Sequence, residues 1–176
     1  MTFAILGQHL SFFTDNISKD SMSKQIIIFE DASGLCVLYP ILECGLSVEE
    51  IAKKDAPEGL PYNIIEASTL PDTFKFRSAW RALPELAGVK VDLETARLVA
   101  QQLRRLKRQM DLEPLDAQVN YSIGNPEKLA ELEEQREAIR IANAALQISI
   151  DAATTTTELD ELTAFAGVHG MPPVSV

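Results

Sequence analysis

The chain has 176 residues, which is the length of one domain with room for a second small unit. Its hydrophobic fraction of 46% and charged fraction of 24% are ordinary for a globular protein and argue against extensive disorder and a fibrous repeat. The formal net charge of −10 opposes binding to nucleic acid or to an anionic membrane unless a concentrated basic patch overcomes it.

The cysteines and the hydropathy pattern exclude several further classes. Cys36 and Cys44 are too few for a disulfide scaffold or a four-cysteine zinc site, and we expect both to be buried structural thiols in a reducing cytosol. No stretch approaches the roughly 20 apolar residues of a membrane span. The sequence therefore predicts a soluble protein without a membrane anchor, metal or cofactor.

The first residues do not have the pattern of a secretory signal. No basic residue precedes the apolar patch, and polar residues interrupt it early. Met22 is followed by Ser-Lys-Gln and then by an apolar run, as at a natural chain start. We expect residues 1–21 to be a flexible leader that does not contribute to the fold.

The first predicted elements are a β-hairpin and a short helix. Residues 26–29 and 35–39 are rich in β-branched and aromatic side chains, and a loop that contains glycine separates them. Ser47 and Glu50 then form a capping-box pattern, which predicts a helix that continues to about Lys54.

Two further strands are predicted before the midpoint of the chain, over residues 62–66 and 74–82. The second alternates around Phe76 and Trp80, and prolines bound both. Because strands this short need one another and a covering helix, we expect residues 22–91 to form a small antiparallel sheet module. Trp80 is its predicted anchor.

A long helix is predicted after this module. Asp92 can cap its first turn, and the helical pattern continues to Met110. Pro114 is expected to kink or break the helix, and we interpret residues 115–123 as further helix.

A second long helix and a short one follow. The Gly-Asn-Pro sequence at 124–126 combines a left-handed stop, a cap and a helix-starting proline, and the helix it opens continues to about Ala153. Thr157 is predicted to cap a final short helix that ends near Phe165. Glycines and prolines prevent regular structure in residues 166–176, which we expect to form a flexible tail.

Both long helices carry an apolar stripe with spacings of three and four. The members are Ala96, Val99, Leu103, Leu106 and Met110 on the first helix, and Leu129, Leu132, Arg136, Ile139, Asn143, Leu146 and Ile150 on the second. The first helix is basic between residues 97 and 108, and the second is acidic between residues 127 and 137. These opposite charges favour an antiparallel hairpin, so residues 92–165 are predicted to be a hairpin plus a short helix in an α+β fold.

Arg136 and Asn143 are polar residues inside an apolar stripe. In one interpretation the helix is rotated slightly and both lie at the edge of the interface. In the other they set the register or oligomeric state of a coiled-coil assembly, because a polar seam position penalises mismatched partners. The sequence leaves both interpretations open.

Residues 104–108 form the sharpest basic cluster, which could bind phosphate or form a solvated face beside an acidic helix. The charges spread around more than half of the helix circumference, and this favours the solvated face. Other charged residues lack a nucleophile, a histidine or a phosphate loop that would organise them, so we assign no catalytic, cofactor-binding or metal-binding residue. These residues are Glu49, Glu50, Asp72, Lys75 and Arg77.

Three consecutive features carry a family resemblance. Residues 71–80 read Pro-Asp-Thr-Phe-Lys-Phe-Arg-Ser-Ala-Trp, residues 89–97 read Val-Lys-Val-Asp-Leu-Glu-Thr-Ala-Arg, and a basic helix continues to Asp116. This pattern resembles small proteins of tailed bacteriophages and prophages that are encoded among tail genes. Some of these look like tail assembly chaperones or tail-fibre assembly proteins. The resemblance covers about residues 22–165 and brings no catalytic motif.

The resemblance implies a non-enzymatic accessory protein, in the host cytoplasm or the virion, that binds a phage structural or tail protein. A homo-oligomer is also considered. The candidate partner-binding residues are Trp80, Leu103, Leu106, Arg136 and Asn143, although core packing is the commoner fate of the first three. The alternatives are a phage-encoded regulator or host-takeover protein that contacts nucleic acid through the basic helix, and an enzyme supported by carboxylates alone.

Overall fold

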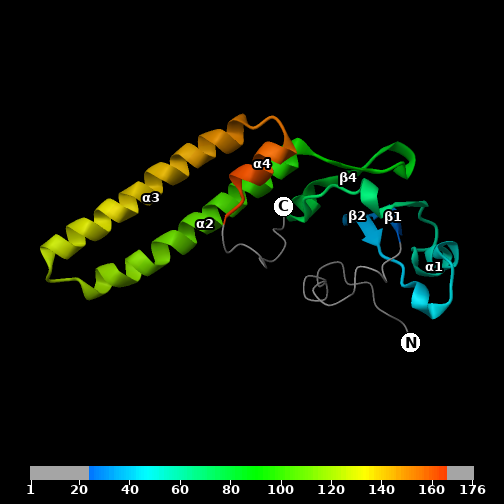
Figure 1. Cartoon of the computed structure of the whole chain (residues 1–176), viewed down its shortest axis with the longest axis horizontal. Coiled ribbons are helices and arrows are strands. Elements are labelled where there is room, and N and C mark those ends of the chain that lie inside the picture. Colours follow the sequence, from blue (N-terminus) through cyan, green and yellow to red (C-terminus); the bar gives the residue numbers. More distant parts are fainter. Residues whose placement is uncertain (1–23, 166–176) are drawn as a thin grey trace. The chain divides into compact units, whose positions relative to one another are not determined.

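The computed structural model describes residues 24–165 (Figure 1). The predicted leader, 1–21, and the predicted tail, 166–176, lie outside the described residues. The chain divides into two compact units, which we describe separately as the sheet unit, residues 24–92, and the helical unit, residues 93–165. Antiparallel strands followed by long helices make an α+β fold, as predicted.

The sheet unit contains a three-stranded antiparallel sheet of order β2-β1-β3. The central strand β1 (Gln25–Asp31) pairs with β2 (Gly34–Leu38) on one side and with β3 (Tyr62–Glu66) on the other. Both faces of β1 are covered, which explains its continuous apolar run. One apolar cluster contains Ile26, Ile28 and Leu86, and another contains Ile27, Val48, Ile51 and Ala52.

The predicted turn and capping box are both present. The amide of Ser33 donates to the carboxylate of Asp31 at 2.7 Å in the turn between β1 and β2. Helix α1 (Val48–Asp55) begins where the amide of Glu50 donates to Ser47 Oγ at 3.2 Å, and the amide of Ser47 donates to the Glu50 carboxylate at 2.8 Å.

The strand predicted over residues 74–82 is wrong in its first part. Phe74–Ala79 forms 3-10 turns, and only Trp80–Ala82 is extended, as β4, which pairs with the unpredicted strand β5 (Val89–Val91). The buried residues of this segment are Phe76, Ala79 and Trp80. Their spacings of three and one fit a helical turn that brings them to one side, whereas a strand would bury every second residue.

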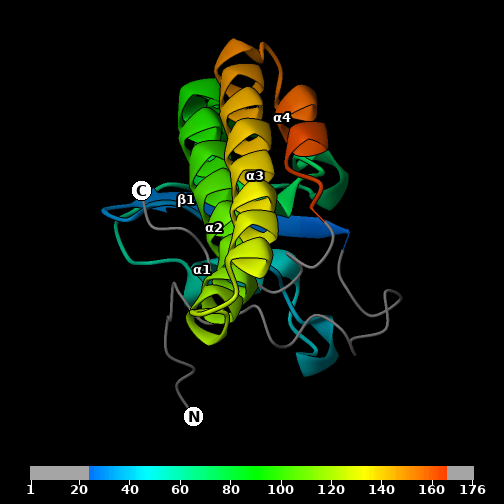
Figure 2. The same ribbon diagram turned by 90° about the vertical axis from the view of Figure 1, so that its left-hand side faces the viewer.

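In the helical unit, α2 (Leu93–Tyr121) and α3 (Pro126–Ala152) lie side by side in opposite directions. The short helix α4 (Thr156–Leu162) packs against both of them (Figures 1 and 2). We expected a kink or a break at Pro114; helix α2 continues through it, so the break is wrong, and the helical interpretation of the following residues is confirmed as far as Tyr121. The loss of one backbone hydrogen bond is tolerated here because Leu115, in the same turn, is buried.

The start of α3 is confirmed, and that of α4 needs a correction. Asn125 caps α3 by accepting a hydrogen bond from the amide of Lys128 at 3.1 Å. Helix α4 is capped by Thr155 rather than Thr157: Thr155 Oγ accepts from the amide of Glu158 at 3.2 Å, and the Glu158 carboxylate accepts from the amide of Thr155. A capping box needs a Glu or Gln three residues after the cap, and Thr155 satisfies this spacing.

The assignment of the cap to Thr155 rather than to Thr157 can be tested. We expect Thr155→Ala to destabilise the native state by about 1 kcal/mol, because the substitution removes the cap of α4. Thr157→Ala is the matched control: this side chain is exposed, and its substitution should change stability by less than about 0.5 kcal/mol. Urea unfolding together with amide hydrogen exchange in α4 measures both effects. Equal stability of the two variants would contradict the assignment.

Candidate interaction surfaces

Polar contacts fix the register between α2 and α3. Arg97 Nη2 donates to the carbonyl of Ala153 at 2.9 Å, and Gln101 Nε2 donates to the carboxylate of Asp151 at 2.6 Å. Further along the hairpin, Arg104 contacts Asn143, and Asp116 contacts Arg136. As the residue numbers rise along α2, the residue numbers of the partners on the other side fall. The predicted antiparallel hairpin is therefore confirmed.

The predicted pairing of the basic run of α2 with the acidic start of α3 is wrong. In the antiparallel register the basic residues 104–108 lie near residue 143, whereas the acidic residues 127–137 lie near the far end of α2. An ion pair that does join the two helices has the opposite polarity, because Asp116 is on α2 and Arg136 is on α3, with 2.9 Å between oxygen and nitrogen. The antiparallel hairpin is therefore present, but attraction between these two segments does not cause it.

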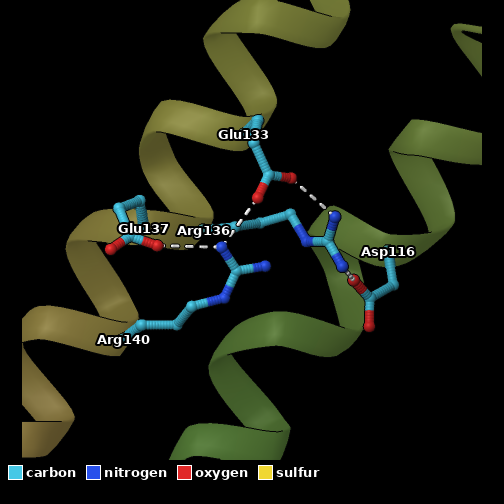
Figure 3. Close-up of polar contacts among 5 residues, drawn as sticks. All are labelled: Asp116, Glu133, Arg136, Glu137 and Arg140. Atoms are coloured by element: carbon cyan, nitrogen blue, oxygen red, sulfur yellow. Dashed lines mark hydrogen bonds and ion pairs between the residues drawn. The ribbon is translucent and has the colours of Figure 1, made fainter.

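The carboxylates of α3 bind arginines of their own helix (Figure 3). Glu133 accepts from Arg140 Nη1 at 2.7 Å and from Arg136 Nη1 at 2.8 Å, while Arg140 also contacts Glu137 at 2.9 Å. The hydrogen bond from Arg140 is the main cause that holds the pKa of Glu133 below its ordinary value. Since these carboxylates are largely exposed, solvent weakens the pairs, and we assign the network an orienting role.

A second polar contact is buried between the helices. Arg104 is only 7% exposed, and its guanidinium donates to the side chain of Asn143 and to Gln101 Oε1, the latter at 2.7 Å. Asn143 Nδ2 returns a hydrogen bond to the carbonyl of Arg104 at 3.2 Å. Burial lowers the pKa of Arg104, since the charged form is removed from water. Asn143 therefore aligns the hairpin within one chain, and a role for it in oligomeric state stays a prediction.

The predicted partner-binding residues lie mostly inside the structure. Trp80 is 2% exposed in the sheet unit, and Leu103 is 6% exposed in the helical unit. Leu106 and Arg136 are half-buried, and Arg136 is held by Asp116 and Glu133. This burial agrees with core packing of the apolar residues, and their contact with a partner stays a prediction.

Sequence reasoning missed an apolar seam on the outer side of α3. Its members are Ala138, Ile141, Ala145, Ile148 and Ala152, which we call the α3 seam, and all are exposed. Ile141 and Ile148 are 63% and 70% exposed. The spacings of three and four that define the seam are visible in the sequence. The stripe that contains Asn143 has the same spacings, so periodicity does not distinguish the two.

The α3 seam faces away from α2. Two residues along a helix turn the side chain by roughly 200°, so Ile141 and Ala145 lie opposite the buried Asn143. The exposure of all five seam residues shows that neither α2 nor α4 covers this side of α3. Near its end the seam meets a shallow groove between α3 and α4 with an acidic edge. The lining residues are Ser149, Ala152, Ala153, Glu158, Glu161 and Leu162.

Other candidate chemistry is sparse in the part of the chain that the structure describes. Cys36 is half-buried and Cys44 is exposed, so the expected burial is wrong for Cys44, whose thiol donates to the carbonyl of Ile41. Among residues 24–165 no three His, Cys, Asp or Glu side chains are grouped so that they could hold a metal ion. Over the same residues, no helix has the length and apolar character needed to cross a membrane.

Comparison of the chain with models of protein families, with curated proteins and with solved structures finds no match in any of the three.

The buried contact between Arg104 and Asn143 allows a double-mutant test. We expect Asn143→Leu to destabilise the native state by about 2–3 kcal/mol, because it removes an acceptor from a buried guanidinium. Arg104→Leu/Asn143→Leu should cost less than the sum of the two single variants, since no charge remains to be satisfied. Urea unfolding measures this coupling, with Asn120→Leu on the exposed side of α2 as the control. Additive single effects would show that the two residues do not act together.

Proposed function

We propose that this chain is a non-enzymatic accessory protein of a tailed phage or prophage that acts by binding a structural or tail protein, in the host cytoplasm or the virion. The observation that carries the proposal is the exposed α3 seam. Isoleucines that recur every seven residues with alanines between them match the seam of a two-helix contact. The resemblance of residues 22–165 to proteins encoded among phage tail genes supports the class of partner.

The chemistry of the α3 seam favours a helical occupant. Alanines leave space for the side chains of a facing helix, and burial of each isoleucine contributes roughly 1.5–3 kcal/mol. Carboxylates lie beside the seam: on α3, Glu137 is paired with Arg140 and Asp151 accepts from Gln101, and Glu158 and Glu161 line the groove. The partner is therefore a helix with an apolar stripe between basic flanks, and charge complementarity selects its register.

The proposal predicts which variants lose the partner. We expect Ile141→Gln/Ile148→Gln to weaken binding at least about 100-fold, because it removes two buried isoleucines from the contact. Ile123→Gln is the matched control, since Ile123 is as exposed but lies in the loop after α2, away from the seam. Co-purification of the tagged full chain from cells in which the phage or prophage is induced measures the loss, with the partner identified by mass spectrometry.

Two outcomes would contradict this proposal. Recovery of the same tail protein by the seam variant and by the wild type would remove the α3 seam as the contact. Concentration-dependent sedimentation that the seam substitutions abolish, without loss of a phage partner, would identify a second copy of the chain as the occupant. Since Ile123, Ile141 and Ile148 are all exposed, the seam variant and the control should both fold like the wild type.

One observation favours the alternative of a regulator that contacts nucleic acid. Arg105 and Arg108 are exposed on α2, and neither forms an ion pair with any of residues 24–165. The acidic segment that sequence reasoning placed beside them lies elsewhere on the hairpin. These two charges are therefore available to phosphates, although the net charge of −10 works against them.

Salt dependence distinguishes this alternative. If the basic helix binds DNA, retention on immobilised duplex DNA should fall steeply with salt concentration. Arg105→Gln/Arg108→Gln should then reduce the slope of log K against log salt by roughly two, while Lys53→Gln/Lys54→Gln on α1 should leave it unchanged. Absence of retention by the wild type at low salt would eliminate the alternative.

A further inference from the structure

The sheet unit contains a half-buried cation without a counter-charge. Arg77 lies in the 3-10 segment before β4, and its Nη1 atom is buried and has no hydrogen-bond partner. Its electrostatic neighbours are Tyr39 and Cys36, both of which are neutral at pH 7. Within residues 24–165 no carboxylate pairs with this guanidinium.

An aromatic ring lies against the guanidinium, and a second ring packs on the first. Arg77 Cζ lies 4.6 Å from the centroid of the Trp80 ring, and the Phe74 ring lies 5.4 Å from the same ring. Trp80 is 2% exposed, and its Nε1 donor also has no partner. Phe74 is 61% exposed and Tyr39 is 39% exposed, so aromatic rings at the surface accompany two unsatisfied donors beneath it.

Other arginines of the described chain have polar partners, and the buried Arg104 donates to Asn143 and Gln101. Arg97, Arg136 and Arg140 each bind a carboxylate. Arg105 and Arg108 are exposed, so water can satisfy them. The Nη1 atom of Arg77 has no such partner, burial removes part of the hydration of the guanidinium, and the Trp80 ring replaces only a fraction of that loss. An anion with oxygen acceptors would supply the missing interactions.

We propose that the sheet unit binds an oxyanion, the carboxylate or phosphate group of a ligand, at the guanidinium of Arg77 and the indole N–H of Trp80. Phe74 and Tyr39 form the exposed aromatic edge of this site. The site lies in a different unit from the α3 seam, so it can exist whether or not that seam binds a helix.

Trp80 is the single tryptophan of the chain, and its fluorescence therefore reports directly on this site. The full chain is titrated with sodium phosphate and, separately, with sodium acetate, while sodium chloride keeps the ionic strength constant. We expect a saturable change in Trp80 emission with at least one of the two anions. The same anion should raise the thermal midpoint of unfolding, because it binds the native state. Response to acetate alone identifies a carboxylate ligand, and response to phosphate alone identifies a phosphate ligand.

Variants assign the effect to Arg77. Arg77→Met should weaken the binding of the active anion at least tenfold, and Arg77→Lys should weaken it because an ammonium lacks the planar fork of donors. Lys53→Met is the matched control, since it removes an exposed cation of α1 in the same unit and should keep the titration of the wild type. If Arg77→Met does not fold, the Arg77→Lys titration decides. An unsaturable response of the wild type to both anions, or the same affinity in the Arg77 variants, overturns the proposal.

Discussion

The buried hydrogen bonds between Arg104 and Asn143 determine how the helical unit presents itself. They fix which turn of α2 faces which turn of α3, and they also fix the rotation of α3 about its own axis. If α3 rotated to hide Ile141, Asn143 would turn towards solvent and a buried guanidinium would lose an acceptor. The exposed isoleucines are therefore a consequence of the polar contact on the other side of the same helix.

Local signals predicted the parts of the fold that local physics controls. The Ser47 capping box and the Asn125 cap act within a few residues, so the sequence contains all of their partners. The assignment of Thr157 as the cap of α4 was wrong although it is equally local, because four consecutive threonines offer similar oxygens and the position of Glu158 decides among them. The strand predicted around Phe76 was wrong because, over so short a length, the apolar residues fit both the strand period and the helical period. Packing favours the helical one.

Long-range contacts could not be predicted in the same way. The opposite charges of the two long helices suggested their pairing, but an antiparallel register brings Arg136 to Asp116 and leaves Glu133 to the arginines of its own helix. The candidate residues Trp80 and Leu103 were identified as large apolar side chains, and that property also suits a core position. Two seams with the same spacing run along α3, and periodicity cannot tell which of them the chain covers itself. Arg77 was noted as one of several charged residues, and only its surroundings distinguish it.

In its second half, helix α3 has apolar residues on two sides, because it buries Ile150 and exposes Ile141 and Ile148. Its inner side places Asn143 against Arg104, whereas its outer side places isoleucines in water. The polar contact inside this otherwise apolar interface gives the hairpin a defined register, because a shifted register would leave buried donors unsatisfied. The apolar surface not used there remains on the outside as a straight seam with acidic edges, held in one orientation by the same polar contacts. A rigid, oriented seam loses less entropy when a partner helix binds it than a flexible one does, and this is the physical reason to regard the hairpin as an association surface.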